Sequence, residues 1–100
     1  VAAGMCVAAL GSQTGGSITR PASYCGVCGF KPTIGQLSLE GIVPFSTPLD
    51  HPGPIASCVA DLRLLFHTMS AAAEVTDSSQ SSPPRIGVIE SYFLEQADSE

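Results

Sequence analysis

A serine follows a short run of glycines near the start of the chain. Ser17 comes directly after Gly15 and Gly16, within the stretch GSQTGGSITRPASYCGVCGFKPT of residues 11–33. Glycines leave the backbone N–H groups uncrowded, so several of these groups can point at one place. Such a loop can stabilise a developing negative charge, and a serine hydroxyl beside it could be the nucleophile that creates the charge. The pattern therefore indicates nucleophilic chemistry with an oxyanion site.

Three other interpretations of this loop have to be weighed. Serine in a glycine-rich loop is most often a plain turn residue. His51, which follows Asp50, could complete a Ser-His-Asp triad, but Thr19 stands where the G-x-S-x-G elbow of α/β-hydrolases has its second glycine. An anion-binding module is the third alternative, although the loop lacks the GK[ST] of a phosphate-binding P-loop.

Two ordered blocks of this chain resemble the amidase signature family of serine hydrolases. The first lies in residues 11–33, and the second comprises residues 48–54 (PLDHPGP) and 59–61 (VAD). The resemblance implies an α/β fold, here a segment of an α/β/α layered enzyme with a mixed central sheet. It also implies hydrolysis of a carboxamide C–N bond through a Ser–cis-Ser–Lys triad. The cis-serine and the catalytic lysine lie upstream in family members, so we expect residues 1–100 alone to be inactive.

The same resemblance gives roles to the residues of the glycine loop. Ser17 is expected to be the nucleophile that forms an acyl-enzyme. Gln13 and Arg20 are expected to support the loop, joined by a hydrogen bond where many members carry an Asp that can pair with the arginine. Loss of one oxyanion-hole donor raises a barrier by on the order of 2.7–4 kcal/mol. The expected donors are the backbone N–H groups of Thr14, Gly15, Gly16 and Ser17.

The remaining basic side chains are not expected to be the catalytic base. Lys31 is the only lysine, but in the family pattern it is a structural position, and we expect it to be semi-buried and bound to carbonyls. The base would be a desolvated lysine upstream. By resemblance His51 belongs to a structural loop, and His67 is expected at the surface of a helix. A catalytically silent scaffold of the same fold stays an alternative, because the two upstream residues decide it.

The composition indicates a piece of a larger protein. Charged residues make up 13% of the 100 residues, against roughly 25% in an average domain, and the mean hydropathy is positive. A free-standing domain this small must cover much of its surface with polar groups. We therefore expect residues 1–100 to be an internal segment of one amidase domain, incomplete at both ends.

The distribution of charge and of apolar residues limits the partners. The net charge is −5, all of the acidic residues lie after Leu39, and no basic patch points to nucleic acid. No apolar run approaches the ~20 residues that span a bilayer. A small-molecule amide is the expected partner, no cofactor is implied, and a cytoplasmic location is expected; substrate identity and oligomeric state are left open.

Four cysteines raise the question of a disulfide framework or a metal site. Cys25 and Cys28 have the CxxC spacing of zinc sites, but zinc needs two further ligands and the chain has no second CxxC. Our interpretation is that Cys25, Cys28 and Cys58 are small buried apolar residues and that no metal is bound.

The hydrophobic pattern predicts strands and helices that alternate. The clearest helix contains a single apolar stripe, with Pro54 in its first turn. This stripe consists of Ile55, Val59, Leu62, Phe66 and Met69. The other predicted segments are the end of a helix leading into a strand (1–10), a loop (11–16), a helical turn (21–25), a strand and turn (30–39), an extended proline-rich loop (41–54), a flexible connection (71–84), a strand (85–89) and a helix start at Ser91.

Overall fold

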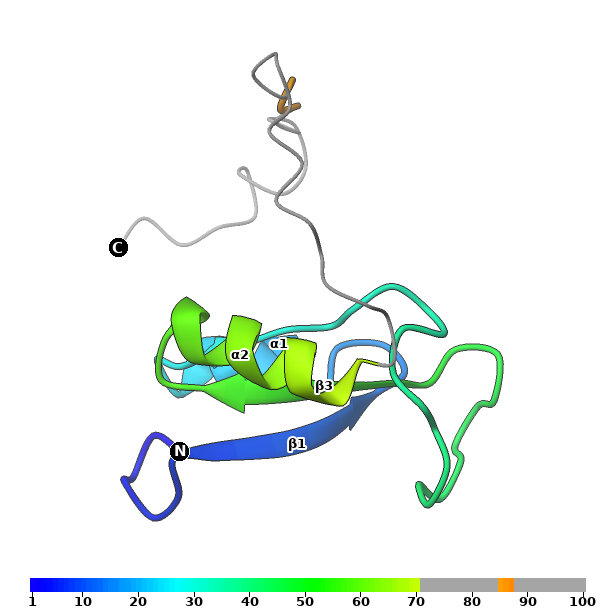
Figure 1. The fold of residues 1–100 in the computed structure, drawn as a ribbon, viewed down its shortest axis with the longest axis horizontal. Helices are drawn as coiled ribbons and strands as arrows, with labels where there is room; N and C mark the ends of the chain where they lie inside the picture. Colours follow the sequence, from blue (N-terminus) through cyan, green and yellow to red (C-terminus); the bar gives the residue numbers. More distant parts are fainter. Residues whose placement is uncertain (71–84, 88–100) are drawn as a thin grey trace.

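The structure is a computed structural model, and it describes residues 1–70 and 85–87. Within them the three strands form one antiparallel sheet, in the order β1-β3-β2 (Figure 1). The expected α/β class is therefore confirmed, while every strand pairing in the described part is antiparallel. The elements along the chain are β1 (Ala8–Gln13), α1 (Thr19–Tyr24), β2 (Cys28–Gly29), β3 (His51–Ala56) and α2 (Val59–Met69).

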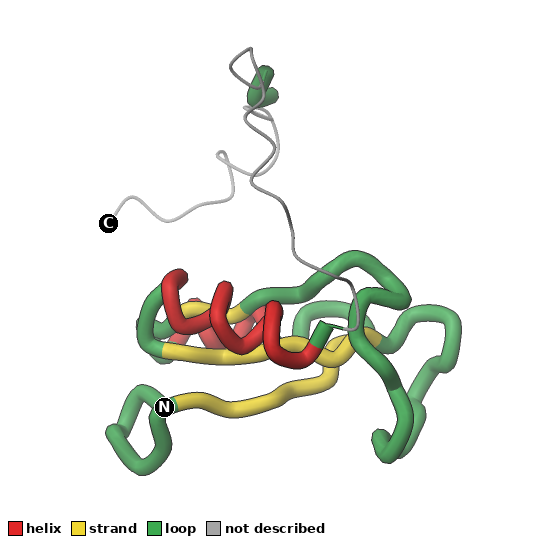
Figure 2. The backbone as a smooth tube through the Cα atoms, viewed as in Figure 1, coloured by secondary structure: helices red, strands yellow, loops and turns green. Residues whose placement is uncertain are grey.

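The two helices lie on opposite faces of the sheet. Gly29 of β2 packs against Ala22 of α1, whose Cβ lies 2.8 Å from the place where a Cβ on Gly29 would be. The next residue, Phe30, contacts Phe66 of α2, with ring centroids 5.2 Å apart in an edge-to-face arrangement. Because consecutive residues of a strand point to opposite faces, α1 and α2 enclose the sheet between them. Figure 2 shows α2 in front of the strands and α1 behind them.

The central strand β3 contains two prolines, Pro52 and Pro54, which is why the sequence predicted an extended loop there. Proline has no N–H to donate and is rare in central strands. The Phe30 N–H donates to the Pro54 carbonyl at 3.0 Å, so Pro54 directs its backbone groups toward β2 and away from β1. The missing N–H groups thus fall on the β2 side. On that side only Cys28 and Gly29 pair with β3. The strand expected over residues 30–39 is therefore not formed, and these residues are a loop.

Ile18 is completely buried in a niche formed by one glycine from each strand. A Cβ on Gly11, Gly29 or Gly53 would lie 3.0–3.2 Å from three different carbons of the Ile18 side chain. Gly11 and Gly53 are direct partners in the β1–β3 register. Side chains larger than hydrogen would fill the niche, so the glycines allow the loop residue Ile18 to sit directly on the sheet.

The beginning of the chain differs from the prediction. The expected helix end in residues 1–10 is absent, and those residues form turns before β1 begins at Ala8. β1 continues through Gly11 to Gln13, so the loop begins at Thr14 and not at Gly11. Glycine at position 11 did not end the strand because it lies opposite Gly53, under Ile18.

Helix α1 begins two residues before the expected Pro21 and ends at Tyr24. Gly26 has a φ of +64°, the left-handed conformation that glycine adopts readily. The N–H groups of Gly26 and Val27 donate to the carbonyls of Ser23 and Ala22 at 3.2 and 3.0 Å, which is a Schellman ending. Gly26 therefore ends α1, one residue beyond the helical turn expected over residues 21–25.

Helix α2 begins at Val59, so the prediction of a helix from Ile55 was wrong at its start. Ile55 belongs to β3, and Pro54 precedes the helix by five residues. Leu62 is buried, whereas Val59 is 71% exposed and Met69 is 37% exposed. The expected apolar stripe therefore reaches the sheet only in part.

The predictions for the end of the chain lie mostly outside the described residues. These are the flexible connection over residues 71–84, the remainder of the strand over 85–89, and the helix from Ser91. Residues 85–87 are described and belong to no helix or strand. Within the described ranges, no helix is long and apolar enough to cross a membrane.

Candidate functional site

The glycine loop joins β1 to α1 at the edge of the sheet. It starts at Thr14, where β1 ends, and Ser17 lies two residues before the first residue of α1. The Ser17 side chain is exposed, while its neighbour Ile18 is anchored in the glycine niche. The fold therefore holds the backbone of the loop at Ile18 and leaves the adjacent serine hydroxyl on the surface.

Gln13 fixes the far end of the loop from its buried position at the end of β1. Its side-chain oxygen Oε1 accepts the N–H groups of Ile18 at 2.8 Å and Thr19 at 2.9 Å, and Nε2 donates to the Gly15 carbonyl at 3.3 Å. One amide side chain thus bridges the loop from its first glycine to the start of α1. Gln13 therefore contacts the loop at Gly15 and at the residues that lead into α1.

Four backbone donors of the loop remain unused within the described part of the chain. The N–H groups of residues 14–17 donate to no described residue, whereas those of Ile18 and Thr19 are taken by Gln13. The hydroxyl of Ser17 likewise has no hydrogen-bond partner among residues 1–70 and 85–87. The loop therefore presents free donors next to an exposed serine.

Arg20 lies against the loop but does not bond to Gln13. The Arg20 guanidinium covers Gly16, because a Cβ on Gly16 would be 2.9 Å from Nη2. The expected hydrogen bond from Arg20 to Gln13 is not formed. The Gln13 amide is hydrogen-bonded to the loop backbone and to the Thr19 hydroxyl instead. Arg20 thus adds a positive charge beside the loop.

Asp50 is the site residue that the sequence interpretation missed. It is only 2% exposed, and its Oδ1 accepts the hydroxyl of Thr14. Its Oδ2 accepts the N–H groups of Phe45 and Ser46, both at 2.8 Å. The available signal was the PLDHPGP block, which marks Asp50 as part of the second motif. Its contact with the glycine loop, 36 positions away in the sequence, could not be read from the spacing.

The environment of Asp50 favours its ionised form. The hydrogen bond from Thr14 lowers the pKa of the Asp50 carboxyl below its ordinary value, and the N–H groups of Ser46 and Phe45 and the nearby His51 act in the same direction. Burial raises this pKa, but it does not outweigh the hydrogen bonds. Asp50 is therefore an anion that is fully occupied as an acceptor.

The lowered pKa of Asp50 predicts a specific acid sensitivity. An aspartate in the unfolded chain has a pKa of about 3.9, and the pKa of Asp50 in the folded chain is lower. The contribution of the ionised Asp50 to stability is therefore complete above the unfolded pKa. The contribution is lost as the pH falls through the folded pKa. We expect the midpoint of urea unfolding of the intact protein to fall less steeply between about pH 6 and pH 3 in Asp50→Asn than in the wild type. Parallel curves for the two proteins would contradict this.

The Ser-His-Asp alternative has little support in the geometry. His51 Nδ1 lies 2.6 Å from the carbonyl of Leu49, and the carboxylate of Asp50 is engaged by Thr14 and by backbone N–H groups. In a triad the Asp would accept the Nδ1–H of the histidine. His67 lies on helix α2, as expected, and is half-buried.

Lys31 is exposed, and its Nζ donates to the carbonyl of Pro32 at 3.0 Å. The prediction that this lysine bonds to a carbonyl is confirmed, and the prediction that it is semi-buried was wrong. Pro32 is buried, whereas Lys31 beside it is exposed.

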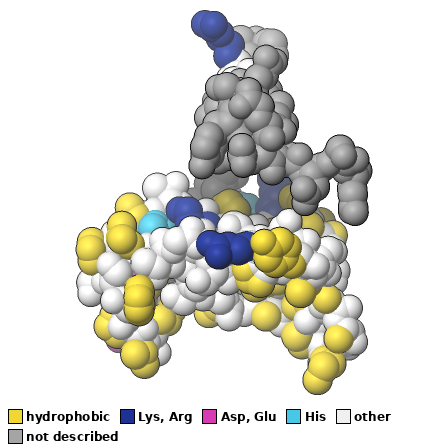
Figure 3. Space-filling model, turned by 180° about the vertical axis from the view of Figure 1, so that it is seen from behind, with side chains coloured by type: hydrophobic (Ala, Val, Ile, Leu, Met, Phe, Trp, Pro, Cys, Tyr) yellow, Lys and Arg dark blue, Asp and Glu magenta, His cyan; other side chains and the backbone are white. Residues whose placement is uncertain are grey.

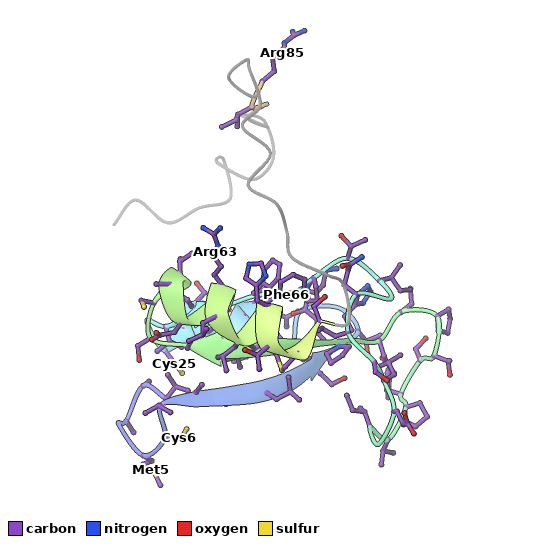
Figure 4. The ribbon with its side chains drawn as sticks, viewed as in Figure 1. Met5, Cys6, Cys25, Arg63, Phe66 and Arg85 are labelled. Carbon is purple, nitrogen blue, oxygen red and sulfur yellow. The ribbon has the colours of Figure 1, made fainter. Side chains whose placement is uncertain are left out.

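The interpretation of the cysteines as buried was also wrong. Cys25 and Cys58 are exposed and Cys28 is half-buried, and all of the described cysteines are free thiols. Cys25 follows the end of α1 and Cys58 caps the start of α2, so both occupy ends of elements and not the core. Figure 4 shows Cys25 beyond α1 and Cys6 in the loop before β1. Among the described residues no group of three potential metal ligands comes together.

Comparison with known proteins identifies the class. The family model described as "Amidase" matches residues 1–99, so this chain belongs to the amidase family. A curated relative is the A subunit of the glutamyl-tRNA(Gln) amidotransferase from Thermodesulfovibrio yellowstonii, 45% identical over 114 aligned residues. The match covers 100% of this chain and 24% of that protein, so the chain spans about a quarter of the relative's length.

Solved structures of amidases share the fold of this segment. An amidase family protein from Bacillus anthracis superposes with a TM-score of 0.70 at 40% identity, over 74% of this chain and 15% of that one. The peptide amidase PAM, solved with the competitive inhibitor chymostatin, superposes with a TM-score of 0.68 at 36% identity, over 86% and 18% of the two chains. The chain is thus homologous both to the A subunit of a glutamyl-tRNA(Gln) amidotransferase and to a peptide amidase.

Proposed function

We propose that this chain carries the nucleophile and the oxyanion loop of an amidase that hydrolyses a carboxamide C–N bond. In this proposal Ser17 forms the acyl-enzyme, and the N–H groups of Thr14, Gly15, Gly16 and Ser17 bind the oxyanion. Gln13 and Arg20 support the loop. The whole enzyme would be an α/β/α layered protein with a mixed central sheet, of which residues 1–100 are an internal segment.

The observation that carries the proposal is the loop with its unused donors. An oxyanion site needs N–H groups that are held in place and are not already bonded. Gln13 takes the N–H groups of Ile18 and Thr19 and leaves those of residues 14–17 free, next to the exposed Ser17. A serine that only formed a turn would not require the N–H groups before it to be kept free while the next two are bonded to Gln13.

The proposed reaction has two stages, acylation of Ser17 and hydrolysis of the acyl-enzyme. The Ser17 oxygen attacks the carbonyl carbon, its proton passes to the base, and the carbonyl oxygen becomes an oxyanion facing the loop. The C–N bond then breaks, and the nitrogen leaves as ammonia or an amine after it takes up a proton. Water hydrolyses the remaining ester and regenerates the serine. The base is the upstream lysine that acts through the cis-serine, by resemblance to the family.

Relatives of this chain act on different carboxyl derivatives. The name of one relative refers to glutamyl-tRNA(Gln), and another is a peptide amidase. Both names are compatible with an acyl group held on a serine, and our proposal is limited to that shared chemistry. A small-molecule carboxamide is the substrate we propose for the assay, and the cytoplasm is the proposed location.

Exposed apolar side chains support the proposal that this segment is completed by other parts of a larger domain. Met5, Val7 and Phe45 are each 89–90% exposed. Hydrophobic side chains reach the surface on the face seen in Figure 3. Arg63, by contrast, extends from α2 on the side away from β1 (Figure 4). We propose that other parts of the domain cover these side chains.

A fluorophosphonate probe tests the proposal without knowledge of the substrate. In the intact enzyme the probe should attach covalently to Ser17, and mass spectrometry of the digested protein should locate the adduct there. Labelling should be lost in Ser17→Ala and kept in Ser12→Ala, since Ser12 is an exposed serine within β1. An adduct at another serine would show that the nucleophile lies elsewhere, and no adduct at all would favour the catalytically silent scaffold.

Replacing His51 by glutamine should change the rate of acyl transfer by less than about tenfold, because His51 bonds to the Leu49 carbonyl and not to Asp50. Loss of a true general base costs on the order of 10²–10⁴ in rate. The measurement is the rate of hydroxamate formation from a simple amide and hydroxylamine. A loss in the larger range would restore the Ser-His-Asp mechanism.

A further inference from the structure

The contact between Thr14 and Asp50 lies where the chain leaves the sheet to form the glycine loop. Gln13 and His51 form the terminal pair of the antiparallel β1–β3 ladder. Thr14, which follows Gln13, and Asp50, which precedes His51, lie directly beyond that pair. The Thr14 hydroxyl donates to Asp50 Oδ1 at this point. A side-chain hydrogen bond thus extends the connection between the two strands by one position, to the first residue of the loop.

Asp50 is itself held rigidly. Its Oδ2 accepts two backbone N–H groups, from Phe45 and Ser46, and its own N–H donates to the Ser46 carbonyl at 2.8 Å. Burial limits the access of competing water to the carboxylate. Hydrogen bonds to an ionised acceptor are shorter and roughly twice as strong as those between neutral groups. The carboxylate is therefore a fixed anchor, and Thr14 is attached to it.

The glycine loop is consequently held at both ends by different residues. Asp50 holds Thr14 at the start, and Gln13 holds Ile18 and Thr19 at the end. The N–H groups of residues 14–17 lie between these two attachments and have no acceptor among the described residues. Gln13 also binds the Gly15 carbonyl, so the contact that Asp50 adds is the attachment of the Thr14 side chain itself.

We infer that Asp50 is a positioning residue for the proposed oxyanion loop, acting through the hydroxyl of Thr14. This inference rests on the proposed function of that loop. Asp50 does not touch the substrate and does not transfer a proton. It fixes the direction in which the backbone leaves β1, and so the place where the free N–H groups meet the developing negative charge. A misplacement of about 1 Å at such a site can cost about 10²-fold in rate.

The test is the second-order rate constant for fluorophosphonate labelling of Ser17 in the intact enzyme. Thr14→Val removes the hydroxyl at nearly constant volume, and we expect labelling to slow by about tenfold to a hundredfold. Thr14→Ser keeps the hydroxyl and should stay within about threefold of the wild type. The matched control is Thr68→Val, because Thr68 is an exposed threonine that bonds only within α2.

Asp50→Asn and the double variant with Thr14→Val test the coupling. The asparagine amide can donate to the Thr14 hydroxyl, so the single Asn variant should lose less rate than Thr14→Val. The double variant should label no more slowly than Thr14→Val alone, because residues that act through one contact are not additive. Each melting temperature is measured alongside, so that loss of the fold is separated from loss of position.

The outcomes separate this inference from the proposed function. If Ser17 is labelled and Thr14→Val labels at the wild-type rate, Asp50 only shapes the turn of residues 45–50 and the inference is wrong. It is also wrong if Thr14→Ser is as slow as Thr14→Val, or if the two single losses multiply in the double variant. If Ser17 of the wild type is not labelled, the proposed function fails and the inference fails with it.

Discussion

Replacing Ser17 by alanine in the intact enzyme is expected to lower amide hydrolysis by on the order of 10⁶-fold, the size of loss when a serine hydrolase loses its nucleophile. Without the hydroxyl no acyl-enzyme can form, while the free N–H groups of the loop can still bind substrate. The measurement is the release of ammonia from a panel of simple carboxamides, with kcat and KM determined separately. We expect the loss to fall on kcat.

Ser23→Ala is the matched control for this experiment. Ser23 is a second exposed serine, six residues further on in α1, and its replacement should change kcat by less than about twofold. Hydrolysis by Ser17→Ala at the wild-type rate would show that the nucleophile lies elsewhere. A wild-type protein that neither hydrolyses amides nor takes up the fluorophosphonate would be a silent scaffold.

Replacing Gly53 by alanine is expected to destabilise the folded protein by about 3 kcal/mol or more, because the added methyl group overpacks the interior. The new Cβ would lie 2.1 Å from the Phe30 carbonyl oxygen and 3.1 Å from the Ile18 side chain. Backbone cannot give way as a flexible side chain can, so β3 and the loop after β2 would have to separate. The measurement is the midpoint of urea unfolding of the intact protein.

Gly15→Ala provides the contrast. A Cβ on Gly15 would meet nothing within 4 Å, so its effect on the unfolding free energy should stay within about 1 kcal/mol. Gly11→Ala should lie between the two, because its Cβ would meet only side-chain carbons, the nearest 3.0 Å away on Ile18. Equal midpoints for Gly53→Ala and Gly15→Ala would show that the sheet accommodates the extra methyl and that the niche is not tight.

The local features of the site could be predicted from the sequence. Ser17 in a glycine loop, the helix after it and the glycine at the end of that helix depend on neighbouring residues, and local conformational preferences decide them. Helix α2 was predicted for the same reason, through its apolar periodicity. Its start was placed four residues too early because Ile55, an apolar residue at helical spacing, pairs with Ala9 in the sheet.

The features that depend on distant partners could not be predicted. Prolines at positions 52 and 54 argue against a strand unless one knows that their missing N–H groups face the short β2 side. The same holds for Asp50, whose partner Thr14 is far away in the sequence and becomes its neighbour only through the β1–β3 pairing. Exposure of Cys25 and Cys58 likewise follows from their places at the ends of helices, which the sequence did not define sharply enough.

The glycine niche around Ile18 makes the position of the proposed nucleophile loop dependent on correct strand alignment. Gly11 and Gly53 face each other and Ile18 only in one register, and a slip of a single residue would turn side chains of the opposite face toward the isoleucine. A sheet that paired wrongly during folding could not seat Ile18, and Ser17 beside it would be displaced. The niche thus couples the register of the sheet to the position of Ser17, so a misaligned molecule would lack the loop geometry that we propose for acyl transfer.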